Sequence, residues 1–180
     1  MTIKPYYSEP GIEIYHGDCR DILPHLPKVD LVLTDLEVGR AGEYLVAADL
    51  LLSGYGAFLT AQGLSCDIIL EANGRLFKVQ VKTTRKPIPV PNRKKRTQKY
   101  CFNVRRCGKN GRRSYRDKEV DLFALVAIDS REIGYIPAEN AKQTMFFLPV
   151  GSEPIRKTGS YSQSHLSDFT IDLALKGISA

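Results

Sequence analysis

The sequence predicts an α/β fold in which helices flank a mixed β-sheet. Apolar residues recur at three-to-four spacing from Gly42 to Leu52, which indicates a helix. Two β-rich runs, residues 66–72 and 75–84, are separated by Asn73-Gly74, the dipeptide most typical of a tight hairpin. These two strands are therefore expected to pair antiparallel. Three further strands are predicted, at residues 100–105, 120–129 and 132–136.

Length and composition place the chain among ordinary globular proteins with one main domain and an appendage. It has 180 residues, of which 43% are hydrophobic and 9% aromatic. No apolar run approaches the ~18 residues of a membrane helix and the first residues lack a secretory pattern, so a cytoplasmic protein is expected. The cysteine spacing suggests neither a disulfide framework nor a zinc site, and we expect reduced thiols at Cys19, Cys66, Cys101 and Cys107.

Positive charge is concentrated in residues 85–118, here named the basic segment. It contains 14 Lys or Arg residues and one acid, whereas the rest of the chain has 12 basic and 19 acidic residues. Such a local excess is typical of a polyanion site and indicates nucleic acid as the partner. Tyr100, Phe102 and Tyr115 lie within the segment and could stack on bases. A solvated, flexible loop is the alternative interpretation.

The basic segment is expected to leave the preceding strand as an arm or hairpin that runs along DNA. Alternating prolines at its start, Pro87, Pro89 and Pro91, favour an extended connector. Its cations should contact phosphates, and its arginines are also suited to reading guanine edges. The predicted DNA-binding residues are Arg85, Lys86, Arg93, Lys94, Lys95, Arg96, Lys99, Arg105, Arg106, Arg112, Arg113 and Arg116.

The strand at residues 75–84 is expected to have two chemically different faces. Because side chains alternate along a strand, Val79 and Val81 share one face, while Gln80 and Lys82 share the other. The apolar face should pack on the predicted helix. The polar face is then left to carry chemistry.

The hairpin also predicts a partner for Gln80. In a turn closed at Asn73-Gly74, paired positions sum to 147, so Asp67 lies opposite Gln80 with Cβ atoms ~5 Å apart. A carboxylate and an amide carbonyl at that separation can bind one hard cation such as Mg²⁺. Lys82, two residues on, could hold the attacking water or a phosphate.

A longer pattern contains this constellation and resembles PD-(D/E)XK nucleases of the group I intron homing endonuclease type, over about residues 38–140. Glutamine is often found in that group at the place of the second acid, as with Gln80, while the proline that opens the nominal motif is absent before Asp67. The matching residues are Gly39, Gly42, Glu43, Val46, Leu50, Gly54, Tyr55, Asp67, Gln80, Val81, Lys82, Thr83, Thr84, Val120, Asp121, Phe123, Tyr135, Ile136 and Pro137.

The resemblance implies a restriction-endonuclease-like core and Mg²⁺-dependent hydrolysis of double-stranded DNA. Asp67 and Gln80 would bind the Mg²⁺. Glu43, in the first turn of its helix, would reach the same metal directly or through water, and Lys82 would position the nucleophile. Asp121 and Pro137 are expected to be structural, the first by bonding the basic segment and the second by opening a short turn or helix.

Two DNA strands require two such sites, so a homodimer or larger homo-oligomer is expected, in a bacterial or phage context. Two alternatives remain open. One is a junction resolvase or restriction-type nuclease with the same metal site. The other is a DNA-binding module whose site is inactive because Gln80 weakens metal binding.

The N-terminal part carries a second resemblance. Residues 12–35 resemble the start of an amino-group DNA methyltransferase, up to an Asp of its catalytic motif, here Asp35. Leu36-Glu37 stand in place of two prolines and no glycine-rich cofactor loop is found, so methyl transfer is not expected. The predicted division is a methyltransferase-like βαβ fragment, residues 1–36, and a nuclease domain, residues 37–180.

The abrupt change from one resemblance to the other suggests an intron-borne nuclease reading frame that continues from the upstream exon of a methyltransferase gene. A gene-prediction error and a degenerate fusion are the alternatives. A βαβ fragment with an apolar strand at residues 29–33 cannot bury itself alone, so it should dock on the nuclease domain or on a second subunit. After Gly151 the chain is expected to be loop, with residues 169–175 as a last strand or helix.

Overall fold

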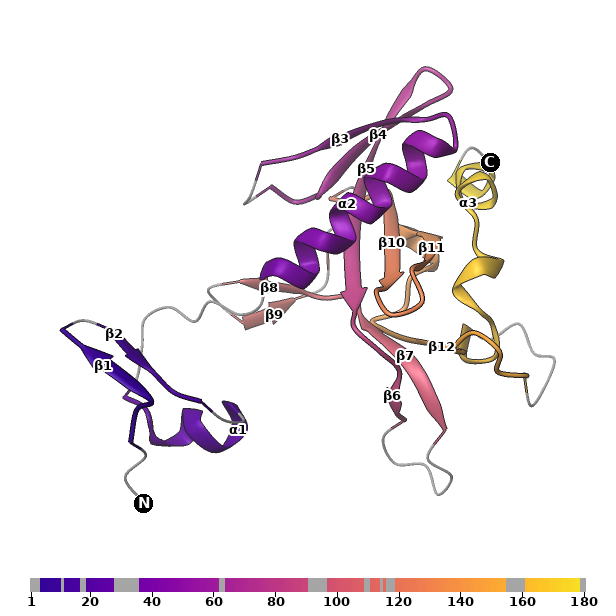
Figure 1. Cartoon of the computed structure of the whole chain (residues 1–180). Helices are drawn as coiled ribbons and strands as arrows, with labels where there is room; N and C mark the ends of the chain where they lie inside the picture. The colour runs from indigo at the N-terminus through magenta and orange to yellow at the C-terminus, as the bar shows by residue number, and fades with distance from the viewer. Residues whose placement is uncertain are drawn as a thin grey trace. The chain divides into compact units, whose positions relative to one another are not determined.

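The computed structural model describes residues 4–10, 12–16, 19–27, 36–61, 64–90, 97–108, 111–113, 115, 119–154 and 161–178 (Figure 1). The chain divides into two compact units, residues 1–34 and 35–180. In the first unit, β1 (Tyr7–Glu9) pairs antiparallel with β2 (Ile12–Ile14). A short helix, α1 (Cys19–Ile22), and a 3₁₀ turn (Leu23–His25) follow. The apolar strand expected at residues 29–33 lies outside the described residues.

The larger unit is built on a five-stranded mixed sheet with the strand order β11-β10-β5-β4-β3. Two helices pack on it, α2 (Leu36–Leu52) and α3 (Ile171–Ile178). The predicted fold class, a mixed sheet flanked by helices, is confirmed. The strands of this sheet are β3 (Gly56–Leu59), β4 (Ile68–Ala72), β5 (Arg75–Thr84), β10 (Leu122–Ala127) and β11 (Glu132–Pro137).

The β4–β5 hairpin has the predicted register. Ile68 pairs with Val79 and Leu70 with Phe77, so paired positions sum to 147. At the turn, Asn73 and Gly74 both have positive φ, 52° and 71°. This is the left-handed backbone that a two-residue hairpin turn requires and that Asn-Gly adopts at low cost. Turn chemistry therefore sets which side chains of the two strands meet.

The apolar face of β5 packs against α2, as predicted. Val79 and Val81 join Val46 and Leu50 of the helix in one core cluster, to which α3 also contributes. The helix approaches β5 closely at Gly42, where an added Cβ would overlap the Thr83 side chain. Gly42 therefore sets the distance between α2 and β5.

The boundaries of α2 differ from the prediction. The helix begins at Leu36 rather than at Gly42, six residues earlier, and so includes Gly39 as well as Gly42. Glycine is a poor helix former, and two of them in four residues concealed the first turns from the periodicity argument. Burial against β5 outweighs that intrinsic cost.

The basic segment forms the crossover between the two central parallel strands. β5 and β10 run parallel, with Gln80 beside Phe123 and Lys82 beside Leu125. Parallel neighbours need a long connection, usually a helix. Here the described part of the connection contains the short strands β6 (Ile88–Pro89), β7 (Gln98–Asn103), β8 (Arg106–Gly108) and β9 (Gly111–Arg113).

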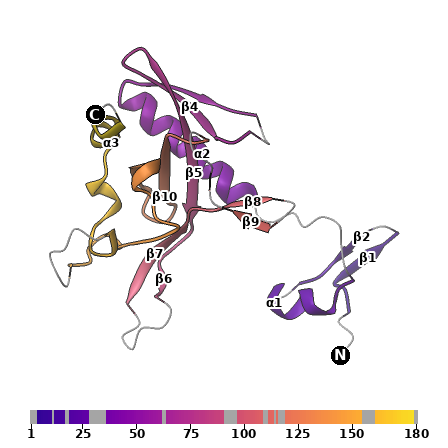
Figure 2. The same cartoon turned by 180° about the vertical axis from the view of Figure 1, so that it is seen from behind.

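A second apolar cluster covers the other face of the sheet. β7 pairs with β6 and with β12 (Thr144–Phe147), and β6 and β7 extend beyond the end of β5 (Figure 2). Tyr100 and Phe102 of β7 are each 2% exposed and pack in this cluster with Phe123 of β10. The expectation that Tyr100 and Phe102 stack on bases is therefore wrong, because their rings form core. The flexible-loop interpretation fails for β7 for the same reason.

Asp121 and Pro137 have structural roles. The Asp121 carboxylate accepts a hydrogen bond from the Lys78 backbone N–H at 2.7 Å, so it ties β10 to β5 and not to the basic segment as expected. Pro137 precedes a 3₁₀ turn (Ala138–Asn140), as predicted. Further 3₁₀ turns follow at Tyr161–Gln163 and Leu166–Asp168. Among the described residues, no helix combines the length and the apolar character needed to cross a membrane.

The close approach at Gly42 leads to a stability prediction. Gly42→Ala should lower the free energy of unfolding by about 1–2 kcal/mol, because overpacking a buried site outweighs the gain in helix propensity. The change can be measured by urea denaturation. Gly39→Ala is the matched control: an added Cβ there meets nothing within 4 Å, so it should stabilise the helix.

A second substitution tests the cause of that loss. The Thr83 hydroxyl is the atom nearest to the added Cβ, and it has no hydrogen-bond partner among the described residues. Thr83→Ala should therefore restore much of the stability lost in Gly42→Ala. If the double variant is no more stable than Gly42→Ala alone, the contact with Thr83 is not what limits the helix.

Candidate active site

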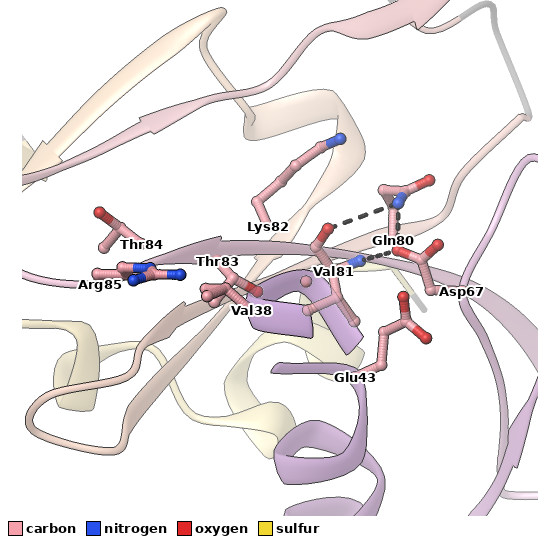
Figure 3. A pocket seen from close by; sticks show the side chains of 10 residues that line it. Val38, Glu43, Asp67, Gln80, Val81, Lys82, Thr83, Thr84 and Arg85 are labelled. Atoms are coloured by element: carbon pink, nitrogen blue, oxygen red, sulfur yellow. Dashed lines mark hydrogen bonds between the residues drawn. The ribbon is translucent and has the colours of Figure 1, made fainter. Parts of the chain in front are cut away.

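A pocket of about 490 Å³ opens where the second half of β5 meets the first turns of α2. Figure 3 shows the side chains that line it. Glu43, Asp67, Gln80 and Lys82, the four residues that the sequence singled out, all line this pocket. The other lining residues are Val38, Gly39, Val81, Thr83, Thr84 and Arg85.

Asp67 is fixed at the edge of the pocket by backbone hydrogen bonds. Asp67 directly precedes β4. Its backbone N–H donates a hydrogen bond to the Val79 carbonyl and its carbonyl accepts one from the Thr60 N–H, and both hydrogen bonds are 2.9 Å long. Its Oδ2 accepts from the Val81 backbone N–H at 2.8 Å and from the Gln80 side-chain amide. The predicted pairing of Asp67 with Gln80 is thus present as a direct side-chain contact (Figure 3).

Glu43 enters the pocket from α2 and faces Asp67 (Figure 3). It lies in the third turn of the helix and not in the first, as expected, because α2 begins at Leu36. Its side chain is 18% exposed and makes a 2.8 Å ion pair with Arg40, one turn earlier on the same helix. Arg40 was missed by the sequence argument, although a cation three residues before Glu43 is a recognisable helical pair.

The electrostatics of the two carboxylates favour a bound cation. Burial raises the pKa of Glu43 and the nearby charge of Asp67 raises it further, against the opposing effect of Arg40. Burial likewise raises the pKa of Asp67, against the Val81 N–H, Lys82 and Arg40. Both charged forms are therefore destabilised by their surroundings, and a positive ion between them would relieve this.

The oxygen donors of the pocket fit a small divalent metal. Two carboxylates and one amide carbonyl are hard oxygen ligands of the kind Mg²⁺ prefers. In the described part of the chain, no third acid, histidine or cysteine joins Glu43 and Asp67 to make a larger cluster. The amide nitrogen of Gln80 now faces Asp67, and a half-turn of the amide would present its oxygen instead.

Lys82 leaves β5 on the same side as Gln80 (Figure 3). Its ammonium donates to the Tyr115 hydroxyl at 2.9 Å and makes a longer contact, 3.5 Å, with the Arg105 carbonyl. Tyr115 was predicted as a base-stacking residue, but its ring instead packs edge-on against Phe123, with centroids 5.2 Å apart. No local pattern could have found the contact between Lys82 and Tyr115, because 33 residues separate them.

Apart from Lys99, the predicted DNA-binding residues fall into three groups. Arg85 and Lys86 are exposed where the chain leaves β5, and Arg85 lines the pocket. Arg105 is half-buried, and the backbone of β8 and β9 carries Arg106, Arg112 and Arg113. Arg93, Lys94, Lys95, Arg96 and Arg116 lie outside the described residues.

Lys99 contradicts its predicted role. Its side chain is 1% exposed and its ammonium donates to the Ser162 carbonyl, so it is buried and is not available to contact a DNA phosphate. Lys99 lies on the face of β7 opposite to Tyr100 and Phe102, and both faces of the strand are buried at this point. Charge composition alone could not distinguish this buried lysine from exposed cations of the segment such as Arg85 and Lys86.

Comparison with known proteins agrees with this geometry. The solved structure of a bacterial homing endonuclease, I-Ssp6803I, is similar with a TM-score of 0.61 at 18% sequence identity, over 82% of this chain and 97% of that one. Among curated protein sequences, none matches. The PD-(D/E)XK endonuclease family matches residues 35–166, which contain every residue of the pocket. The chain therefore belongs to the PD-(D/E)XK endonuclease family.

Proposed function

We propose that the chain is a Mg²⁺-dependent endonuclease that cleaves both strands of double-stranded DNA at a long, specific site. The observation that carries this proposal is the pocket itself. Glu43 and Asp67, two acids with raised pKa, face one another there beside Gln80 and Lys82. The crossover that leaves the same end of β5 holds most of the basic residues of the chain.

In this proposal Asp67 and Gln80 hold the metal, and Glu43 reaches it directly or through water. A bound Mg²⁺ supplies Lewis-acid polarisation of the phosphate and a more acidic water. Lys82 places its positive charge where negative charge develops on the phosphate. Val81 orients the Asp67 carboxylate through its backbone N–H, which keeps one carboxylate oxygen directed into the strand and leaves the other for the cation.

The basic crossover positions the duplex in this proposal. Arg85 and Lys86, which are exposed directly after β5, would contact phosphates next to the scissile bond. Contacts of this kind contribute affinity without sequence preference and weaken with salt. Since one pocket cleaves one strand, we propose that two copies of the chain act together on a duplex.

We also propose a target for this nuclease. The likeness of residues 12–35 to the start of a DNA methyltransferase suggests that the chain cuts an uninterrupted methyltransferase reading frame. The test compares two plasmids incubated with purified protein and Mg²⁺, one with the uninterrupted frame and one interrupted after the codon equivalent to Asp35. Cleavage of the uninterrupted plasmid alone would support homing.

Other outcomes favour the alternatives. Cleavage of both plasmids at one shared sequence would favour a restriction-type nuclease, and preference for a synthetic four-way junction would favour a resolvase. Binding of duplex DNA with no cleavage in Mg²⁺ or Mn²⁺ would indicate an inactive binding module and would contradict the proposed function.

The role of Gln80 as a ligand can be tested by two substitutions of similar size. Gln80→Glu keeps an oxygen donor and should retain cleavage within about tenfold, whereas Gln80→Leu removes it and should cost about 10²-fold or more. Single-turnover cleavage of the plasmid measures both. If the two variants lose activity equally, Gln80 acts by its shape and not as a ligand.

A further inference from the structure

Tyr115 comes from the basic crossover but contacts the lysine of the pocket. Its hydroxyl accepts a hydrogen bond from the Lys82 ammonium at 2.9 Å, and the same nitrogen lies 5.2 Å from the centre of the tyrosine ring. Both side chains are half-buried. The contact is therefore partly shielded from water, where a hydrogen bond from a charged donor is stronger than on an open surface.

The tyrosine ring is itself held by the sheet. It packs edge-on against Phe123, with an interplanar angle of 71°, and Phe123 is 2% exposed. Phe123 lies on β10 beside Gln80 of β5 in the parallel register. The hydroxyl of Tyr115 thus has a position set by the strand next to the one that carries Lys82.

A second acceptor comes from the same part of the crossover. The carbonyl of Arg105 lies 3.5 Å from the Lys82 ammonium. Arg105 immediately precedes β8 and Tyr115 follows β9, and these two strands pair as an antiparallel ribbon. These two acceptors therefore flank one ribbon whose backbone carries Arg106, Arg112 and Arg113.

We propose that Tyr115 is a positioning residue for Lys82, and that through it the β8–β9 ribbon is coupled to the reaction. The inference rests on the proposed nuclease function. Lysine has a flexible four-carbon stem, and its ammonium takes a single position only where acceptors hold it. Misplacement of a reacting group by about 1 Å can cost about 10²-fold in rate, so partial loss of this restraint should have a measurable effect.

The test is Tyr115→Phe, which removes the hydroxyl and keeps the ring on Phe123. Single-turnover cleavage of a supercoiled plasmid in Mg²⁺ should slow about tenfold, while the DNA dissociation constant stays within about twofold. Tyr100→Phe is the matched control. The Tyr100 hydroxyl hydrogen-bonds Asp129 and Ser130, neither of which lines the pocket. This variant should cleave at the wild-type rate even if it is less stable.

A double-variant cycle tests the contact without metal or DNA. Thermal unfolding of Lys82→Met, Tyr115→Phe and the double variant should show losses that do not add, because either single change already removes the hydrogen bond. Additive losses would overturn the inference. If Tyr115→Phe cleaved at the wild-type rate, the positioning role of Tyr115 would be overturned while the nuclease function stood. If the wild-type protein cut no DNA, both the positioning role and the nuclease function would be overturned.

Discussion

Asp67→Asn is expected to abolish cleavage while making the protein more stable. The asparagine keeps an oxygen for the Val81 N–H but removes the negative charge that the metal requires, so the single-turnover rate should fall by about 10³-fold or more. DNA affinity should change little, because the basic residues that would attract the duplex lie elsewhere in the chain. Plasmid cleavage and a fluorescence-anisotropy titration of a labelled duplex measure the two effects.

The gain in stability follows from the direction of the pKa shift. Burial raises the pKa of Asp67 above its ordinary value of 3.8, so the charged carboxylate destabilises the folded state at neutral pH. The neutral asparagine does not, and the melting temperature should rise. The difference from wild type should vanish below about pH 3.8, where the carboxyl is protonated in both folded and unfolded states.

Asp121→Asn is the matched control for this variant. Asp121 also accepts a backbone N–H, that of Lys78, but it does not line the pocket. The Asp121→Asn variant should therefore cleave DNA at a rate near that of the wild type. If Asp67→Asn retained cleavage, or if both asparagine variants lost it equally, the assignment of the metal to Asp67 would be wrong.

Lys82→Met should reduce cleavage by about 10²-fold or more without unfolding the protein. Methionine approximates the lysine stem but carries no charge to stabilise the phosphate in the transition state. The loss should appear in the single-turnover rate at saturating protein and not in the DNA dissociation constant. The same measurements used for Asp67→Asn separate these two quantities.

Lys78→Met is the control for the loss of a lysine from β5. Lys78 lies on the same face of the strand, four residues earlier, and is not among the residues that line the pocket. Its replacement should leave the cleavage rate within about twofold of wild type, in contrast to Lys82→Met. Equal losses in the two variants would indicate that general positive charge along β5, and not a placed ammonium, supports cleavage.

The basic segment contributes both to the apolar core and to the surroundings of the pocket. Its β7 strand supplies core residues such as Tyr100 and Phe102, while Tyr115 touches the pocket lysine. We therefore expect substitutions in this segment to separate into those that destabilise the apolar cluster around β7 and those that alter the proposed DNA contacts. The first kind lowers the melting temperature, and the second changes the salt dependence of binding by about one phosphate contact per lost cation.

The local sequence was sufficient to predict that Asp67, Gln80 and Lys82 lie close together in the candidate site. The turn at Asn73-Gly74 allows one register, that register pairs Asp67 with Gln80, and strand alternation places Lys82 beside them. These contacts depend only on residues within one hairpin, where the chain has few alternatives.

Tertiary structure alone decided the rest. Three features join residues that are 33 or more positions apart: the parallel pairing of β5 with β10, the close approach of Gly42 to Thr83, and the contact of Lys82 with Tyr115. A fourth, the burial of Lys99, reverses the usual preference of lysine for the surface. Pairing between distant strands leaves no pattern in the local sequence, because it is selected by how much apolar surface the sheet and the elements packed on it bury together. Packing between distant segments likewise buries Lys99 and brings Tyr115, from the basic segment, against the lysine of the pocket.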